Sequence, residues 1–134
     1  MPKSDPAITK AIEARHAEWT QLFNGKQYGR IAETYYAPDG RLMGPNMPIV
    51  EGRANIGKTL EQLGQVFSDA KVTTKAVWPA GDLVVTQGVY RAKVRTASGS
   101  EYNDTGKFLE VFRQEHGLWL SFYDMFSSDL EHQA

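Results

Sequence analysis

The chain has 134 residues, and 15 Lys and Arg against 16 Asp and Glu give it a formal net charge of −1. This length fits one domain of ordinary size, so we expect residues 1–134 to form a single domain. The nearly balanced charge argues against a phosphate backbone as partner, and we expect no nucleic acid. Because cysteine is absent, disulfides, thiolate nucleophiles and zinc–thiolate sites are excluded.

Membrane and metal partners are not expected either. No apolar run approaches the roughly 20 residues that span a bilayer. The N-terminal segment MPKSDP lacks the apolar core of a signal peptide, so we expect a cytoplasmic protein. The three histidines, His16, His116 and His132, are scattered without H-x-x-x-H or H-x-x-E spacing, so we predict no metal site. We likewise expect no cofactor.

The first half of the chain predicts three helices. Residues 6–24 carry apolar side chains at helical spacing, and Ser4 or Asp5 can cap this helix. A shorter helix is expected over residues 28–36, and a third over residues 53–67 with apolar residues at steps of four, three and four. Each helix therefore has one apolar stripe that needs a cover.

The second half predicts strands. A short strand is expected at residues 41–43, between the second and third helices. Four longer strands are expected at residues 72–78, 83–96, 102–113 and 118–126. Strands this close in sequence pair with their neighbours, and one face of the sheet covers the helix stripes. The prediction is an α+β, cone-shaped roll, with three N-terminal helices packed on a strongly curved, mostly antiparallel sheet.

Four segments resemble the nuclear transport factor 2-like superfamily, close to its SnoaL-like branch. Residues 32–42 (AETYYAPDGRL) resemble its second helix and first strand, and residues 50–56 (VEGRANI) resemble the entry into its third helix. Residues 104–119 and 123–129 resemble its penultimate hairpin and its last strand. The resemblance implies the cone fold. It does not imply one function, because this fold hosts isomerases, cyclases, dehydratases, transport adaptors and oligomerisation modules.

Ketosteroid-isomerase-like members of that superfamily use a carboxylate base at the end of the first strand. Their oxyanion hole combines a tyrosine hydroxyl with a protonated acid. Aligned with that pattern, this sequence has Gly44 at the base, Trp19 at the tyrosine and Leu109 near the second acid. The usual isomerase residues are therefore absent.

Three carboxylates on the last two predicted strands are the candidate catalytic residues: Asp104, Glu110 and Asp124. If Phe108 and Phe112 point into the cone, the two-residue period of a strand sends Glu110 there as well. Burial in an apolar pocket raises the pKa of a carboxyl group and lets it act as an acid or base near neutral pH. Asp124 can face inward, or it can accept hydrogen bonds from the backbone just after the strand.

Other placements of these polar residues remain open. Glu110 can instead lie on the outer face, paired with Lys107 or Arg113. Arg15 falls within the apolar stripe of the first helix, where it binds an anionic ligand, orients a carboxylate, or reaches solvent at the helix edge. His16 lies at the margin of the same stripe and is a weaker candidate for a general base.

The aromatic content suits a pocket for a flat apolar ligand. The predicted ligand-binding residues are Arg15, His16, Trp19, Tyr35, Met43, Phe67, Tyr90, Phe108 and Phe112. We therefore expect a SnoaL-like protein that binds a small hydrophobic ligand. Its expected activity is that of a cofactor-independent isomerase, cyclase or hydratase using carboxylate acid–base chemistry. The alternative is a non-catalytic dimerisation or carrier module, and the resemblance implies a homodimer through the outer face of the sheet.

Overall fold

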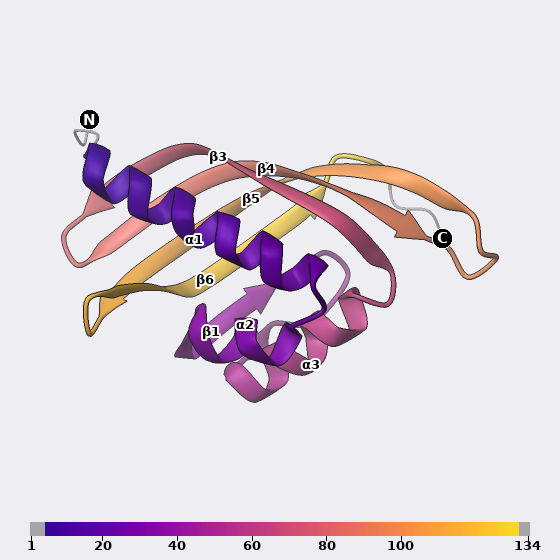
Figure 1. Ribbon diagram of the computed structural model, residues 1–134, viewed down its shortest axis with the longest axis horizontal. Helices are drawn as coiled ribbons and strands as arrows, with labels where there is room; N and C mark the ends of the chain where they lie inside the picture. The colour runs from indigo at the N-terminus through magenta and orange to yellow at the C-terminus, as the bar shows by residue number, and fades with distance from the viewer. Residues whose placement is uncertain (1–4, 132–134) are drawn as a thin grey trace.

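The computed structural model describes residues 5–131, which form three helices and one six-stranded sheet (Figure 1). The elements are α1 Pro6–Asn24, α2 Tyr28–Thr34, β1 Tyr36–Met43, β2 Val50–Glu51, α3 Arg53–Leu63, β3 Phe67–Ala80, β4 Leu83–Arg95, β5 Glu101–Glu115 and β6 Leu118–Ser128. The strand order is β2-β1-β6-β5-β4-β3. None of the helices described between residues 5 and 131 is long and apolar enough to cross a membrane.

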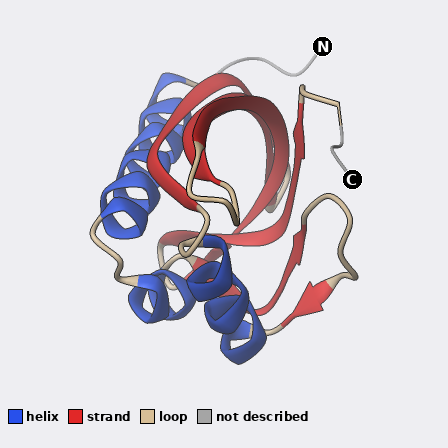
Figure 2. Ribbon diagram, turned by 90° about the vertical axis from the view of Figure 1, so that its right-hand side faces the viewer, coloured by secondary structure: helices blue, strands red, loops and turns tan. Residues whose placement is uncertain are grey.

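The sheet is mixed and strongly curled, with the helices gathered on one side of it (Figure 2). β1 runs parallel to β6, and the other neighbouring strands are antiparallel. α1 packs along β3, while α2 and α3 pack on each other and on β1. The predicted α+β cone with a mostly antiparallel sheet is therefore confirmed.

The start of α1 follows from its cap. The carboxylate of Asp5 accepts hydrogen bonds from the backbone N–H groups of Ala7 at 3.0 Å and Ile8 at 3.3 Å, as an N-cap does. Ser4, the other predicted cap, lies outside the described residues. Two of the residues that α1 buries, Arg15 and His16, are polar, and both need partners in the interior.

The boundary between α2 and β1 differs from the prediction. The helix ends at Thr34 rather than at residue 36, and the strand begins at Tyr36 rather than at residue 41. The backbone N–H of Ser121 donates to the carbonyl of Tyr35 at 2.8 Å, so pairing with β6 replaces the last helical turn. A register shift between Tyr36 and Arg41 accommodates Pro38, which has no N–H to donate to a strand partner.

The third helix is also shorter than predicted. α3 ends at Leu63 with Gly64 as its C-cap, and Phe67 already pairs with Val94 in the sheet. The short strand β2 was not predicted. β3, β5 and β6 extend beyond their predicted ranges because pairing continues there, whereas β4 ends at Arg95, one residue before its predicted end.

Two glycines set how closely the aromatic rings approach the neighbouring strands. A Cβ atom at Gly88 would lie 2.3 Å from Cζ of Phe108, and one at Gly106 would lie 2.3 Å from Cε2 of Tyr90. Such distances are far inside van der Waals contact. Because glycine has no side chain, the rings of Phe108 and Tyr90 can occupy this space on the inner face of the sheet.

Candidate functional site

A cavity of about 100 Å³ lies between the helices and the inner face of the sheet. Eight of the predicted site residues line it: His16, Trp19, Tyr35, Phe67, Tyr90, Phe108, Glu110 and Asp124. The rest of the lining is Phe23, Tyr36, Leu42, Leu60, Leu63, Ala70, Val72, Ala92 and Phe126. The wall is thus mainly apolar and aromatic, with its ionisable groups confined to a few positions.

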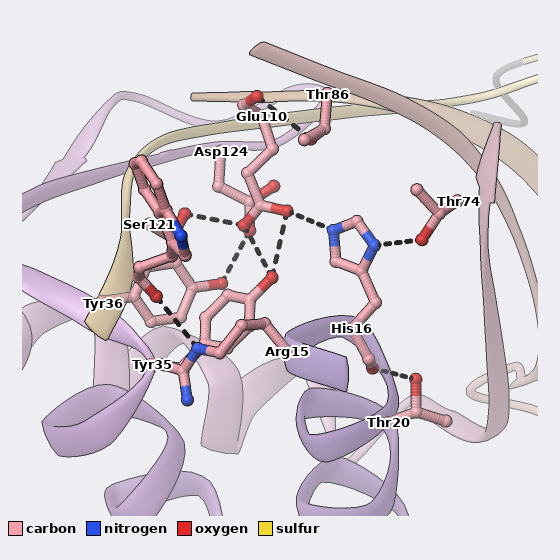
Figure 3. Close-up of polar contacts among 11 residues, drawn as sticks. Arg15, His16, Thr20, Tyr35, Tyr36, Thr74, Thr86, Glu110, Ser121 and Asp124 are labelled. Atoms are coloured by element: carbon pink, nitrogen blue, oxygen red, sulfur yellow. Dashed lines mark hydrogen bonds and ion pairs between the residues drawn. The ribbon is translucent and has the colours of Figure 1, made fainter. Parts of the chain in front are cut away.

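Glu110 is the centre of the polar part of this wall (Figure 3). Its side chain is 2% exposed. The Tyr35 hydroxyl lies 3.0 and 2.9 Å from its two oxygens, and the Ser121 hydroxyl donates to Oε2 at 2.6 Å. Nε2 of His16 lies 3.0 Å from Oε1. Because ionised carboxylates only accept, this set of partners suits a negatively charged Glu110.

The four elements that meet at Glu110 are distant in sequence. Glu110 points inward because Phe108 and Phe112 do, two residues to either side on β5, as the strand period predicts. His16 comes from α1, Tyr35 from the C-terminal end of α2, and Ser121 from β6. The polar cluster therefore forms only when the tertiary fold is complete.

The alternative position of Glu110 on the outer face is wrong. Lys107 pairs with Asp129 at 2.9 Å, and Arg113 pairs with Asp39 at 2.6 Å. These are surface pairs on the other side of β5. The hydrogen bond from Arg113 lowers the pKa of Asp39.

Asp124 lies beside Glu110 on the neighbouring strand, where the two residues are direct partners in the β5–β6 register. The Tyr36 hydroxyl donates to its Oδ2 at 2.7 Å, so Asp124 faces inward. Burial and then the charge of Glu110 raise the pKa of Asp124 well above its usual value of 3.8, and the hydrogen bond from Tyr36 opposes that rise. Asp124 is nonetheless partly exposed, as expected for a side chain on a cavity wall.

The two tyrosines remain donors. Burial and the neighbouring charge of Glu110 raise the pKa of the Tyr35 hydroxyl well above its usual range. Burial and Asp124 do the same for Tyr36. Both hydroxyls therefore keep their protons at any physiological pH and hold the two carboxyl groups in place.

Asp104, the third candidate carboxylate, lies outside the cavity lining. It is buried, and its Oδ1 accepts a hydrogen bond from the Ser128 hydroxyl at 2.5 Å. Its Oδ2 accepts one from Tyr90 at 3.2 Å. Burial, then the charge of Asp104, raises the pKa of Tyr90. Asp104 thus fixes the orientation of a tyrosine that lines the cavity.

Arg15 also lies outside the lining and turns away from the cavity. It donates to the carbonyls of Trp119 at 2.9 Å and Thr34 at 2.6 Å, and to Glu18 at 3.0 Å. Its guanidinium lies 5.1 Å from the ring centroid of Tyr35. These contacts hold the guanidinium against the backbone and away from the cavity, so Arg15 supports the wall behind Tyr35.

Two predicted lining residues occupy other places. Phe112 is fully buried in the core, where its ring contacts those of His16 and Tyr35. Met43 does not line the cavity, whereas the preceding residue on β1, Leu42, does. Alternation along the strand explains this exchange.

The positions that ketosteroid-isomerase-like enzymes use for catalysis carry no acid here. A Cβ atom at Gly44 would lie 2.8 Å from Cζ of Phe126, so the phenyl ring fills the space of a side chain. Leu109 is 49% exposed on the outer face, and Glu110 takes the inward position next to it. Within residues 5–131, no group of three His, Cys, Asp or Glu side chains could hold a metal ion. His132 lies outside the described residues.

Sequence reasoning missed three polar residues of the site. Tyr36 was placed in a helix, Ser121 was not singled out, and Thr74 was one of several threonines in a predicted strand. The hydroxyl of Thr74 lies 2.6 Å from Nδ1 of His16. An apolar stripe containing a histidine signals that a buried partner exists, but not which residue it is.

The chain belongs to the SnoaL-like domain family, whose model matches residues 16–122. No curated protein matches the chain in sequence. Three solved structures of 21% identity or less share its fold. A ketosteroid isomerase-like protein from Erwinia carotovora atroseptica is 21% identical, with TM-score 0.81 over 91% of this chain and 96% of that one.

The other two have different names. A putative calcium/calmodulin dependent protein kinase II association domain from Xanthomonas campestris is 20% identical, with TM-score 0.73 over 98% of this chain and 97% of that one. ActVI-ORFA from Streptomyces coelicolor is 16% identical, with TM-score 0.75 over 92% of this chain and 98% of that one. At these identities the likeness establishes the nuclear transport factor 2-like fold alone.

Proposed function

We propose that the chain binds an uncharged, apolar small molecule in the cavity and exchanges a proton with it through Asp124. This is the acid–base chemistry of an isomerase, cyclase or hydratase that works with protein groups alone. One observation carries the proposal: a carboxyl group with a raised pKa lies on an apolar cavity wall beside a second, closely held carboxylate.

Asp124 is better suited to proton transfer than Glu110. Both oxygens of Glu110 are held by Tyr35, and further contacts come from Ser121 and His16. Asp124 has its hydrogen bond from Tyr36 at Oδ2, which leaves Oδ1 for a ligand. In its neutral form Asp124 donates to a carbonyl or hydroxyl oxygen, and once ionised it can remove a proton from an adjacent carbon.

The lining also restricts the ligand. Two carboxyl groups face the cavity. No lysine or arginine is found among the described residues that line it, so an anionic ligand is disfavoured. The indole Nε1 of Trp19 is buried and makes no hydrogen bond of good geometry among the described residues, although it lies close enough to the Tyr36 hydroxyl to lower the pKa of that group, so an acceptor oxygen of the ligand would compete with Tyr36 for it. The enclosed space of about 100 Å³ approaches the roughly 150 Å³ of a cavity that holds benzene. It therefore suits about one ring, and the rest of a polycyclic ligand would extend beyond it.

A thermal-shift screen tests this function. Uncharged single-ring ketones and phenols, steroids, polyketide-like aromatics and hydrophobic carboxylic acids are compared on the wild type, Asp124→Asn and Glu110→Gln. A ligand present at 100 times its Kd stabilises the folded state by about 2.7 kcal/mol. We expect uncharged ring compounds to raise the melting temperature and the acids to leave it unchanged. A shift from the acids alone would contradict the proposal.

Proton transfer is then tested on the compounds that bind. Exchange of a carbon-bound hydrogen for deuterium, followed by proton NMR, is expected with the wild type and not with Asp124→Asn. The matched control is Asp104→Asn, which alters a buried carboxyl group outside the cavity. Equal exchange by Asp124→Asn and the wild type would remove Asp124 from the chemistry.

A second candidate function, an association module, is favoured by the outer face of the sheet. Leu109 and Met125 are direct partners on β5 and β6 and are 49% and 48% exposed, and Val89 on β4 is 37% exposed. Exposed apolar clusters of this kind mark interfaces, so we propose a homodimer through this face. Light scattering of Leu109→Lys with Met125→Lys should give half the wild-type mass. A wild-type monomer would refute the dimer.

A further inference from the structure

A line of three side chains crosses the wall of the cone. The Thr74 hydroxyl lies 2.6 Å from Nδ1 of His16, and Nε2 of the same ring lies 3.0 Å from Oε1 of Glu110 (Figure 3). The three residues come from β3, α1 and β5. The His16 side chain is 3% exposed, so its ring is held between the two oxygens with almost no contact with solvent.

The two ends of this line open onto different spaces. Glu110 and His16 line the apolar cavity. Thr74 lines a separate groove of about 310 Å³ between α1 and β3, where Thr9 and Glu13 face Lys75 and Trp78. The line therefore joins an outward-facing groove, lined by both polar and apolar residues, to the carboxylate inside the cone.

The backbone of β3 explains how Thr74 reaches the histidine. The register with β4 shifts between Thr74 and Ala76, and such irregularities redirect side chains. The residue paired with Thr74 is Gly88, where a Cβ atom would lie 2.4 Å from the carbonyl oxygen of Thr73. The strands thus approach closely at this point.

The hydrogen-bond roles along the line depend on the tautomer of His16, and an ionised Glu110 selects one of them. An ionised carboxylate accepts only, so Nε2 of His16 carries the hydrogen that faces Glu110. In a neutral imidazole, Nδ1 then has the lone pair and accepts from the Thr74 hydroxyl. Every link consequently points in one direction, from the groove to Glu110.

We propose that Thr74 and His16 form a proton route from the groove between α1 and β3 to Glu110. Hydronium or a buffer acid in the groove gives a proton to the Thr74 oxygen, and the hydroxyl proton of Thr74 passes to Nδ1. The hydrogen on Nε2 passes to Glu110. One proton enters and one arrives, and His16 ends as the other neutral tautomer.

The use of this route rests on the proposed function. An apolar ligand in the cavity displaces the water that otherwise exchanges protons with the inner carboxyl groups. A route through the wall then replenishes Glu110, the strand partner of Asp124, while the ligand is bound. Thr74 and His16 are positioning residues in this scheme because they act through Glu110.

The charged and titratable groups that face the line come from several elements. Glu13 on α1 and Lys75 on β3 lie at the groove end. Tyr35, the C-cap of α2, and Asp124 on β6 lie at the cavity end. Glu13 and Lys75 carry opposite charges beside Thr74, so neither sign dominates the entrance.

Hydrogen exchange at His16 tests the route without any ligand, so the outcome is independent of the ligand screen. A neutral imidazole loses its ring hydrogen readily only after its other nitrogen has been protonated. Exchange of the Nε2 hydrogen for deuterium therefore reports proton arrival at Nδ1, whose hydrogen-bond partner is Thr74. The hydrogen lost from Nε2 leaves through Glu110 into the water of the empty cavity.

The variants are Thr74→Val, Thr74→Ser and the matched control Thr73→Val, followed by nitrogen-15 NMR in deuterium oxide. We expect Thr74→Val to slow exchange at His16 at least tenfold, and Thr74→Ser and Thr73→Val to keep the wild-type rate within about twofold. If Thr74→Val does not fold, Thr74→Ala replaces it. Unchanged or faster exchange without the hydroxyl, or failure of Thr74→Ser to preserve the rate, overturns the proposal.

Discussion

The surroundings of Glu110 and Asp124 differ sharply, although the two carboxyl groups are direct partners on adjacent strands. Tyr35, Ser121 and His16 surround Glu110, whereas among the described side chains Tyr36 is the one that donates to Asp124. The two neighbouring acids thus differ in the number of donors that hold them, and not only in depth. In the proposed function, Glu110 is held in place by several donors, and its neighbour Asp124, with a raised pKa, exchanges the proton with the ligand.

Removal of Glu110 is expected to have the largest effect. Glu110→Ala leaves the hydroxyls of Tyr35 and Ser121 and the ring of His16 without their acceptor. Unpairing a buried polar network of this kind costs about 3 to 5 kcal/mol. Urea unfolding measures the loss, and Glu101→Ala, on the exposed end of the same strand, should change stability by less than about 0.5 kcal/mol. A loss below about 1 kcal/mol would mean that these donors readily find other partners.

A smaller effect is expected when one donor to Glu110 is removed. Ser121→Ala deletes the 2.6 Å hydrogen bond to Oε2. Hydrogen bonds to charged groups contribute about 1.5 to 3 kcal/mol, and the unfolding free energy should fall by that amount. The control is Ser127→Ala, on an exposed position of the same strand. Equal stabilities for the two variants would show that Tyr35 and His16 suffice to hold Glu110.

Asp124→Asn should change how the free energy of unfolding depends on pH. At acidic pH the variant and the wild type should be about equally stable. Since the folded-state pKa of Asp124 is raised above 3.8, the folded protein binds more protons than the unfolded chain between those two pKa values. The contribution of Asp124 to wild-type stability therefore falls as pH rises through this window, by up to about 1.4 kcal/mol per pH unit, and is constant above it. Asp124→Asn should lack this decline, so its advantage over the wild type grows with pH. Parallel unfolding profiles from pH 4 to 8 would contradict the raised pKa.

The smallest effect is expected at Tyr36. Tyr36→Phe removes the hydrogen bond that opposes the raised pKa of Asp124, so that pKa should rise further. The stability loss should be about 1 kcal/mol, the contribution of an ordinary hydrogen bond. Carbon-13 NMR of the Asp124 carboxyl group measures the titration directly. A pKa that falls in Tyr36→Phe would mean that the hydroxyl does not hold the ionised form.

The inward position of Glu110 was predictable, whereas its partners were not. Alternation along β5 places Glu110 with Phe108 and Phe112 because a strand has a strict two-residue period. Ser121 escaped that reasoning because the register between β5 and β6 shifts between Val111 and Phe112, which breaks the alternation on β6. Local periodicity does not reveal such a bulge.

The helical side of the site was recognised only in part. Arg15 and His16 both stood out as polar residues in an apolar stripe, but the helical projection does not show which of the two faces the cavity. In the structure, Arg15 donates hydrogen bonds to the backbone carbonyls of Thr34 and Trp119, and His16 contacts Glu110. Backbone carbonyls that lack a partner within their own element can be identified only in the assembled fold. The same is true of the start of β1 at Tyr36.

The place of β6 in the sheet has a consequence for folding. β6 is the last strand in sequence, yet it lies between β1 and β5, and it contributes Ser121 and Asp124 to the cavity wall. During synthesis, at roughly 5 to 20 residues per second, β1 cannot pair with its parallel partner until residues 118–128 have left the ribosome. The cavity is consequently among the last parts of the protein to form, and a nascent chain that stops short of β6 exposes both an open sheet edge and an unfilled wall.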